Sequence, residues 1–395
     1  MKTFMFLVAT AWGPLISGVS FPELHTIGTN YQIGLDMGRT FRGMIQEFYN
    51  QSSSLAKVTQ FLQTDAGKSY YSGYLEAVTR VFPEYVKELS GLADGAGVSF
   101  MQAFSMMISS EIKAVMKLKG AESCSDVYLA DQQMAIGHNE DADPLLKERS
   151  FLVHAAVVDG AGDVVENFTA YTYAGALSGN AFSFNGDGKV FTVNALYPNI
   201  VEANKIPRYF MNRALLGVKS QGDLEHLLHG LGVGVAYGFN VNYADIRNSS
   251  GILTNYEVSP MKGVSQNLVT KATVARQSGQ GVDTTGHYYH FNMYEHTNIT
   301  QIAKDIVSSE HRKARANQLP PPADVVGVTV ILGDQGDSQY PIYRTPRPSD
   351  EEATIATGIF VLDSCVLLVF KSNPRTTARP ITTINLPHGA MCGQS

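Results

Sequence analysis

Cysteine, tryptophan and charge are all sparse in this chain of 395 residues, which has three cysteines, one tryptophan and 17% charged residues. Three cysteines, at Cys124, Cys365 and Cys392, are too few for a disulfide framework. One bridge between Cys365 and Cys392 is compatible with an oxidising compartment, but isolated cysteines of this kind are more often buried free thiols. We therefore expect these two cysteines to be reduced.

The chain also lacks a strong charge of one sign. It carries 30 lysine and arginine residues against 36 aspartate and glutamate residues, a net charge of −6. This balance excludes the basic surface of a nucleic-acid-binding protein, and no basic cluster predicts attachment to a membrane. Repeats of about 20–50 residues are absent as well, which excludes solenoids and propellers. Hydrophobic residues make up 44%, so the chain can bury a sizeable core.

The N-terminus has the pattern of a secretory signal peptide. Lys2 precedes an apolar run over residues 4–12, and the small residues Ser17, Gly18 and Ser20 follow. The run is too short for a membrane span, and no other stretch is long enough for one. We expect residues 1–20 to be removed and the protein to be secreted or to enter the secretory-pathway lumen; a buried first strand or helix is the alternative. Sequons that predict N-glycosylation lie at Asn50, Asn167, Asn248 and Asn298.

Residues 21–123 have a helical pattern. Ile33, Met37, Phe41 and Ile45 recur every four residues, as on the buried face of a helix. Pro83 is placed to open another helix, and Ser99 is placed to cap an apolar helix over residues 100–118. The first quarter of the chain therefore predicts a helical layer.

After Cys124 the pattern changes to short alternating or apolar runs separated by Gly, Asn and Asp turns. Predicted strands cover residues 126–136, 151–158, 181–184, 190–196, 239–246, 252–258, 287–292, 354–362 and 365–370. Predicted helices cover residues 208–216, 223–231 with Ser220 as the cap, and 299–318. Residues 320–352 have the most irregular pattern. This order predicts an α+β protein, a four-layer αββα sandwich with two antiparallel sheets between helical layers, in one compact domain.

Cys124 is the residue most suited to chemistry. It stands where the helical segment meets the first strand, and Ser125 follows it. The next strand ends in residues 137–142, GHNEDA, with Asn139 and Asp141. Because a hairpin brings such strands side by side, Asn139 and Asp141 are expected near Cys124. Taken alone, a single cysteine is most often a small buried apolar residue, and Asn or Asp near a turn often bonds its own backbone.

These motifs resemble the N-terminal-nucleophile hydrolases of the acyl-CoA:isopenicillin N acyltransferase type. Similar landmarks occur in the same order, including residues 28–34 (GTNYQIG), 184–188 (FNGDG), 256–260 (YEVSP), 290–292 (HFN) and 354–360 (TIATGIF). Within the family, residues 137–142, 206–210 (IPRYF) and 287–290 (HYYH) resemble the arthropod N-β-alanyl-amine hydrolases, which release dopamine or histamine from β-alanyl conjugates. The resemblance covers most of the chain from residue 28 to residue 374.

The resemblance implies a precursor that cuts its own Ser123–Cys124 bond. Residues 21–123 then form one chain, and residues 124–395 form the nucleophile-bearing chain of a processed heterodimer. The free α-amine of Cys124, with a pKa of about 8, takes the thiol proton, so one residue is both base and nucleophile. The resemblance further implies that Asn292 stabilises the oxyanion, that Asp141 orients the amine, and that Asn139 and Ser125 flank the nucleophile.

The implied substrate is a small N-acyl amide, in particular N-β-alanyl-dopamine or N-β-alanyl-histamine. A cationic β-alanyl end requires a carboxylate in the pocket, and Glu140, Asp126 and Asp143 are candidates. An aromatic amine requires an aromatic wall, for which Tyr128 and Tyr288 are candidates. We expect no cofactor and no metal, because the spacing of His287, His290 and His296 fits no standard metal site.

Some positions depart from the family pattern. Ser123 stands where the family has glycine, and Asp126 adds a negative charge that is expected to raise the pKa of the thiol. The arginine that the family has near its last strands cannot be placed, since Ala353 or a neighbour occupies that region. Two alternatives therefore stay open: an acyltransferase that uses the same thioester, and a secreted glycoprotein that keeps the fold without processing or turnover.

Overall fold

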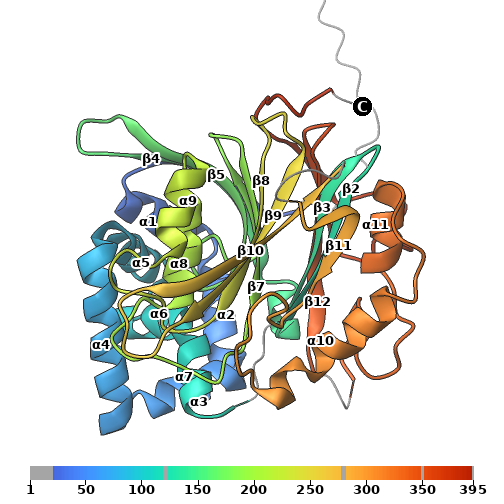
Figure 1. Ribbon diagram of the computed structural model, residues 1–395. Helices are drawn as coiled ribbons and strands as arrows, with labels where there is room; N and C mark the ends of the chain where they lie inside the picture. The colour runs from blue at the N-terminus through green and yellow to red at the C-terminus, as the bar shows by residue number, and fades with distance from the viewer. Residues whose placement is uncertain (1–20, 119–122, 277–281, 348–350, 394–395) are drawn as a thin grey trace, which may run out of the picture.

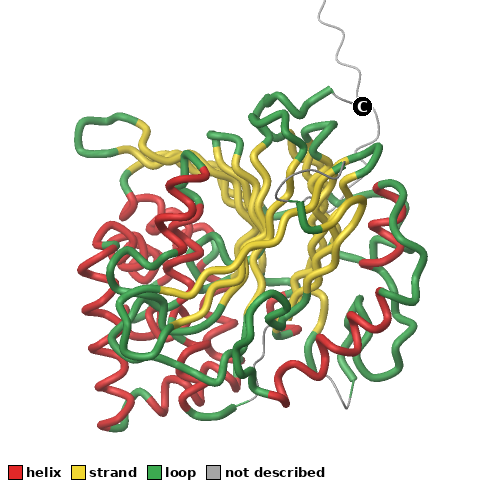
Figure 2. The backbone as a smooth tube through the Cα atoms, in the orientation of Figure 1, coloured by secondary structure: helices red, strands yellow, loops and turns green. Residues whose placement is uncertain are grey.

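The computed structural model describes residues 21–118, 123–276, 282–347 and 351–393. Two β-sheets lie face to face in the middle of the molecule, and a layer of helices covers the outer face of each sheet (Figures 1 and 2). The predicted four-layer αββα sandwich is thereby confirmed. The predicted signal peptide lies outside the described residues.

The larger helical layer comes mainly from the N-terminal part of the chain. Its helices are α1 (Asn30–Thr40), α2 (Arg42–Gln51), α3 (Ser53–Phe61), α4 (Asp65–Val81), α5 (Pro83–Ala96), α6 (Phe100–Met107), α7 (Ser109–Val115), α8 (Arg208–Leu215) and α9 (Gln221–Leu228). The predicted caps are confirmed, since the hydroxyls of Ser99 and Ser220 accept from backbone N–H groups in the first turns of α6 and α9. Among the described residues, no helix combines the length and the apolar character needed to cross a bilayer.

The single helix predicted over residues 100–118 is wrong, because the chain breaks at Ile108 into α6 and α7. The apolar pattern could not show this change of axis. The break turns the polar side of α7 towards α8, where Ser110 accepts from the Arg208 guanidinium at 2.8 Å and Glu111 accepts from the Arg208 backbone N–H at 2.9 Å. The first turn of α7 thus supplies buried polar partners to Arg208 at the start of α8.

The sheet against this layer contains, in order, β1 (Glu23–Gly28), β4 (Ser150–Val158), β5 (Val164–Tyr173), β6 (Phe182–Asn185), β7 (Lys189–Ala195), β8 (Phe239–Asp245), β9 (Ile252–Pro260) and β10 (Asn267–Ala275). The second sheet contains, in order, β11 (Thr284–His290), β2 (Ser123–Ala130), β3 (Met134–Ala142), β12 (Ala353–Val361), β13 (Val366–Phe370) and β14 (Thr382–Asn385). Neighbouring strands are antiparallel, except that β1 is parallel to β4 and a short parallel pairing of β10 with β11 joins the sheets.

Some strand predictions need correction. The run over residues 126–136 is not one strand but the hairpin of β2 and β3, with its turn between Ala130 and Met134. Strands β1, β5, β10 and β14 were not predicted, and β1 lies in the segment predicted to be helical. All four carry polar residues along much of their length and are partly exposed, so they lack the strong apolar signal of the central strands.

The second helical layer contains α10 (Ala303–Ala316) and α11 (Val325–Leu332), and the 3₁₀ turn η1 (Pro144–Leu146) follows β3. Helix α11 lies in the region predicted to be irregular, which is a correction. Its sequence, VVGVTVIL, has hardly any polar face, so no helical period is visible in it. Asp324 caps this helix by accepting from the Gly327 N–H at 2.7 Å.

Strand β2 places the nucleophile between the two sheets. Val127 and Leu129 belong to the apolar cluster under α10 and α11. Cys124, Asp126 and Tyr128 alternate with them and therefore face the first sheet, where Asp126 is bonded by Thr192 and Tyr128 by Asn242. The thiol of Cys124 thus belongs to the interior between the sheets.

Cys365 and Cys392 form a disulfide, with their Cα atoms 5.4 Å apart. The prediction of two reduced thiols is therefore wrong. Cys365 lies in the turn between β12 and β13, and Cys392 lies near the C-terminus, so the long-range folding of the C-terminal segment onto this turn brings them together. Cys124 is the free cysteine and is buried.

Candidate active site

The pairing of β2 with β3 puts an acidic side chain opposite the thiol. Cys124 pairs with Glu140, and Asp126 pairs with His138, so these four side chains share the face between the sheets. The Cys124 Sγ lies 3.7 Å from Glu140 Oε2. Cys124 is only 3% exposed, and both Glu140 and His138 interact with its thiol on this face.

His138 links two carboxylates behind the thiol. Its Nε2 lies 3.0 Å from Glu140 Oε2, and its Nδ1 lies 2.9 Å from Asp126 Oδ1. Asp126 is held further by Thr192, whose hydroxyl donates to it at 2.6 Å, and by the amide of Asn194. A continuous polar chain therefore runs from Cys124 through Glu140 and His138 to Asp126.

The electrostatics of this chain keep the thiol protonated. Burial raises the pKa of the Cys124 thiol to about 12, and the negative charge of Glu140 acts in the same direction. Asp126 contributes to this rise in pKa as predicted, but it is a smaller cause. Burial alone would lower the pKa of His138, yet its two carboxylate partners hold that pKa well above the usual range. Two acidic side chains thus flank one basic side chain beside the thiol.

Asn292 binds the backbone nitrogen of the nucleophile. Its Oδ1 accepts from the Cys124 N–H at 2.7 Å, and its Nδ2 donates to the Ala195 carbonyl at 2.9 Å. The Asn292 backbone N–H donates to Ser309 on α10 at 3.1 Å, which fixes this residue just after β11. The structure therefore brings the predicted Asn292 to Cys124, where it contacts the main-chain nitrogen; its role at an oxyanion stays a prediction.

Arg312 supports the nucleophile from the opposite face of β2. This fully buried guanidinium of α10 donates to the Cys124 carbonyl, to Ser125 Oγ at 2.9 Å and to Asn292 Oδ1 at 2.9 Å. Burial, and then the charge of Arg344, lower its pKa to about 10, so it stays a cation at neutral pH. The side chain of Ser125, predicted as a neighbour of the nucleophile, binds the same arginine as the Cys124 carbonyl.

Asp141 lies on the same face as Arg312. It pairs with Ser123 across the hairpin, accepts from the Thr354 hydroxyl at 2.6 Å, and has its Oδ2 3.9 Å from Arg312 Nη1. Burial raises the pKa of Asp141 to about 7, against the opposing charges of Arg344 and Arg312. The carboxylate is therefore next to the peptide bond whose cleavage is predicted.

Asn139 has a different set of contacts. Its amide donates to the carbonyls of Leu332 and Ile342 at 2.8 and 3.1 Å, and its oxygen accepts from Thr357 at 2.6 Å. The side chain thus ties β3 to the end of α11 and to β12. Asn139 positions the hairpin, and among the described residues its side chain bonds to Leu332, Ile342 and Thr357 rather than to the thiol.

The predicted substrate-binding residues are not all equivalent. Of the three candidate carboxylates, Glu140 lies beside the thiol, Asp126 is bonded to His138, and Asp143 caps η1 at the Leu145 N–H. Tyr128 is fully buried and makes an edge contact with the half-buried Tyr288, with ring centroids 5.3 Å apart. Their role as an aromatic wall stays a prediction.

The structure adds buried residues that the sequence reasoning missed. Arg312 and Arg344 supply the positive charge that could not be placed near Ala353. Arg344 pairs with Glu352, and its backbone N–H donates to the Thr354 hydroxyl. His138 was noticed only as part of a motif. Arginines on a polar helix usually lie in solvent, so no local signal distinguished Arg312.

The histidines considered as metal ligands do not converge. His290 Nε2 lies 3.3 Å from Glu257 Oε1, whereas His296 Nε2 lies 2.7 Å from the Tyr288 hydroxyl. At the nucleophile, one ligand atom each of Cys124, His138 and Glu140 lies within 4.8 Å of the others. The hydrogen bonds of His138 to Glu140 and Asp126 already explain why these ligand atoms lie close together.

All four sequon asparagines are exposed. Asn50 lies on α2, Asn167 on β5, and Asn248 and Asn298 in loops. Glycosylation at these positions would meet no buried side chain.

Comparison with known proteins gives concordant matches. Residues 129–375 match the family described as acyl-coenzyme A:6-aminopenicillanic acid acyl-transferase. A beta-alanyl-dopamine/carcinine hydrolase of Drosophila melanogaster is 30% identical over 370 residues, which cover 90% of this chain and 94% of that protein. Among solved structures, a mutant conjugated bile acid hydrolase from Clostridium perfringens aligns with a TM-score of 0.38 at 11% identity, over 66% of this chain and 92% of that one. Penicillin V acylase from Agrobacterium tumefaciens aligns with a TM-score of 0.37 at 11% identity, over 63% and 83%.

Proposed function

Because the chain belongs to the acyl-coenzyme A:6-aminopenicillanic acid acyl-transferase family, we propose that it is a self-processing cysteine amidohydrolase with Cys124 as the nucleophile. It cleaves its own Ser123–Cys124 bond and then hydrolyses a small N-acyl amide. The substrate that we propose is N-β-alanyl-dopamine or N-β-alanyl-histamine, in line with the Drosophila relative. The reaction needs no cofactor in this proposal.

The single observation that carries the proposal is the hydrogen bond from the Cys124 N–H to Asn292. A side chain 168 residues away, 2.7 Å from this nitrogen, holds the atom that self-cleavage would turn into an α-amine. Arg312 holds the carbonyl of the same residue. Cys124 is therefore anchored at both ends of its main chain, so its position survives the loss of the bond to Ser123.

Self-cleavage proceeds by an N-to-S acyl shift. The Cys124 sulfur adds to the Ser123 carbonyl carbon, the carbon–nitrogen bond breaks, and the nitrogen leaves as an amine after gaining a proton. Water then hydrolyses the thioester, which yields the Ser123 carboxylate and a free thiol. Before cleavage no α-amine exists, so Glu140, at 3.7 Å from Sγ, is the nearest acceptor for the thiol proton.

Turnover repeats this chemistry on a substrate. The α-amine of Cys124, with a pKa of about 8, accepts the proton of the thiol. In the uncut chain, burial raises the pKa of this thiol. The thiolate attacks the substrate carbonyl, the protonated amine product leaves, and water hydrolyses the acyl-thioester. In the acyltransferase alternative, a second amine takes the place of this water.

Glu140 suits the cationic end of a β-alanyl group. Two acidic side chains, Asp126 and Glu140, are bonded to the single basic side chain His138 beside the thiol. An ammonium group near Glu140 would balance the second acidic side chain. This supports a β-alanyl substrate over an uncharged acyl group.

The test begins with intact mass and N-terminal sequencing of the wild-type protein beside Cys124→Ala. We expect two fragments in the wild type, with a new N-terminus at Cys124, and one uncut chain in the variant. The cleaved protein is then assayed for amine release from β-alanyl-dopamine and β-alanyl-histamine, with and without acceptor amines. Acyl-amine product in place of free acid would favour the acyltransferase, and an uncut, inactive wild type would favour the non-catalytic glycoprotein.

We also propose that the protein enters the secretory pathway. The exposed positions of the four sequon asparagines and the Cys365–Cys392 disulfide support this proposal, because disulfides persist in oxidising compartments. Expression in a eukaryotic host should yield protein in the lumen or medium that begins near Phe21 and loses mass on enzymatic deglycosylation. Cytosolic protein that retains Lys2 would contradict the proposal.

A further inference from the structure

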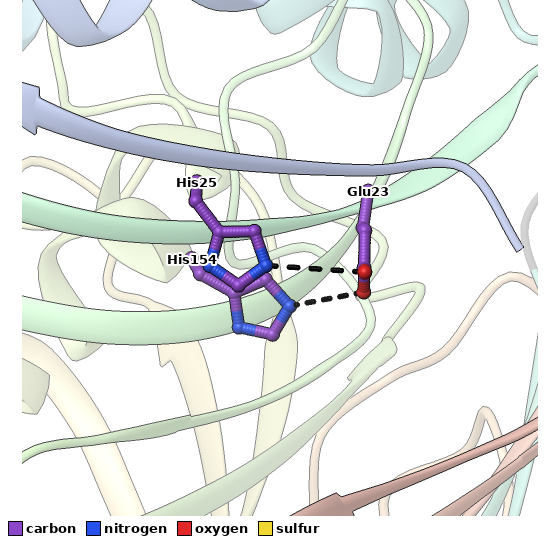
Figure 3. A group of neighbouring side chains, drawn as sticks. All are labelled: Glu23, His25 and His154. Carbon is purple, nitrogen blue, oxygen red and sulfur yellow. Dashed lines mark ion pairs between the residues drawn. The ribbon is translucent and has the colours of Figure 1, made fainter. Parts of the chain in front are cut away.

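A second group of ligand-type side chains lies far from the nucleophile, on the outer strands of the other sheet. Glu23 and His25 are two residues apart on β1, so they share one face of that strand, and His25 pairs with His154 on β4. Figure 3 shows both imidazoles directed towards the Glu23 carboxylate. One ligand atom from each residue lies within 4.8 Å of the other two.

The two imidazoles are stacked with their ring centroids 4.2 Å apart, and each is at ion-pair distance from Glu23, which is also close to the separation of two ligands of one metal ion. His25 Nε2 lies 3.9 Å from Glu23 Oε1, and His154 Nε2 lies 3.6 Å from Glu23 Oε2. Both distances exceed the usual range of a hydrogen bond. Two ligands that each lie about 2.1 Å from a tetrahedral zinc ion are about 3.4 Å apart, which is close to these values.

His154 offers a nitrogen that has no other partner. Among the described residues, its Nε2 is buried and makes no hydrogen bond. Its Nδ1 lies 2.9 Å from Thr169 Oγ1 on the neighbouring strand β5. With Nδ1 donating to Thr169, the lone pair of Nε2 faces the cluster, which is the arrangement of most metal-binding histidines.

We propose that Glu23, His25 and His154 form a binding site for a divalent transition-metal ion, with Zn²⁺ as the expected ion. Two imidazoles and a carboxylate are a common zinc ligand set, and a water molecule completes the tetrahedron. The side chains of His25 and Glu23 are 71% and 50% exposed, so they can turn to converge on the ion, while the 18% exposed His154 provides the fixed ligand. The bound ion would tie the edge strand β1 to β4.

No sequence spacing indicated this site, because the two histidines belong to strands that are distant in the chain. It also lies outside the proposed catalytic machinery, since Cys124, His138 and Glu140 belong to the second sheet. The ligands come from the two outermost strands of the first sheet, so metal binding is expected to act on the stability of that edge.

Isothermal titration of the untagged, full-length protein with ZnCl₂ tests the proposal. We expect one site per chain, an upward shift of the melting temperature with Zn²⁺, and the visible absorption of tetrahedral Co²⁺ when CoCl₂ is used as the probe. His25→Asn should weaken the affinity at least 100-fold, and Glu23→Gln at least tenfold. Both residues are exposed, so folding is expected to survive and is checked by circular dichroism.

Two variants serve as controls. His226→Asn removes an exposed imidazole from α9, away from the cluster, and should leave binding unchanged. Cys124→Ala removes the thiol from the group formed by Cys124, His138 and Glu140, and it should also leave Zn²⁺ binding unchanged. The proposal is overturned if the wild type does not bind Zn²⁺, if His25→Asn binds as well as the wild type, or if binding is lost only in Cys124→Ala.

Discussion

At the scale of single residues, one set of neighbours acts on the thiol of Cys124 and another set holds its main chain. Burial and Glu140 raise the pKa of the thiol, which keeps most of the sulfur protonated in the uncut chain. Asn292 and Arg312 hold the nitrogen and the carbonyl of the same residue. Self-cleavage is therefore expected to rely on Glu140 as the acceptor of the thiol proton, and it would then create a second base, the α-amine, at the residue itself.

Replacing Glu140 with glutamine tests its role in binding the substrate. Glu140→Gln keeps the size of the side chain and removes its charge, and a hydrogen bond to a charged group is worth about 1.5–3 kcal/mol. In protein shown to be cleaved, we expect kcat/KM for β-alanyl-histamine to fall about 10–100-fold, with little change for the uncharged propionyl-histamine. Glu148→Gln is the control, because Glu148 is a 78% exposed carboxylate that pairs with Lys371. An equal loss for both substrates would exclude recognition of the ammonium group.

At the scale of elements, α10 links the segment after β11 to the back of β2. Its side chains Ser309 and Arg312 bond to Asn292, and Arg312 continues to Cys124 and Ser125. On the opposite side of Asn292, the turn over residues 295–297 is held by Glu257 of β9, which accepts from the backbone N–H groups of Glu295 and His296. Helix α10 and, through the Ala195 carbonyl, strand β7 thus fix Asn292 from different layers.

The substitution Arg312→Lys tests the contribution of α10. Lysine keeps the positive charge but has no planar fork, so it cannot bond Cys124, Ser125 and Asn292 together. We expect kcat to fall at least tenfold with a small change in KM, and self-cleavage to slow by a similar factor. Arg315→Lys is the matched control on the same helix, since Arg315 pairs with Asp334 near the surface. Equal effects of the two substitutions would show that only helix stability is involved.

At the scale of the whole molecule, the C-terminal segment closes the end of the second sheet. The disulfide joins Cys392 to the turn between β12 and β13 across 27 residues. The same segment bonds to the first sheet, where the Met391 N–H donates to the Ile246 carbonyl at 2.9 Å. The two sheets, and hence the two walls around Cys124, are therefore tied together at this end.

Removing the disulfide should destabilise the fold without abolishing the chemistry. A bridge that closes a loop of this length is expected to contribute about 3 kcal/mol to the free energy of unfolding, mainly by restricting the unfolded chain. The double variant Cys365→Ser/Cys392→Ser should show this loss in urea unfolding and still cleave at Cys124. Cys124→Ala, which keeps the bridge, is the control. Equal stabilities of the double variant and the wild type would contradict the expected contribution.

The sequence by itself determined the αββα class and the helix caps at Ser99 and Ser220, and it indicated a hairpin beside Cys124 although it missed the turn between Ala130 and Met134. Each of these follows from residues close in the chain, through periodicity, capping and turn chemistry. Only the tertiary structure decided the rest. Arg312 and Asn292 reach Cys124 across 188 and 168 residues, the disulfide required the C-terminal segment to fold back, and His154 meets Glu23 only through the pairing of β1 with β4. Contacts of this kind depend on how layers pack, and packing leaves no local pattern in a single sequence.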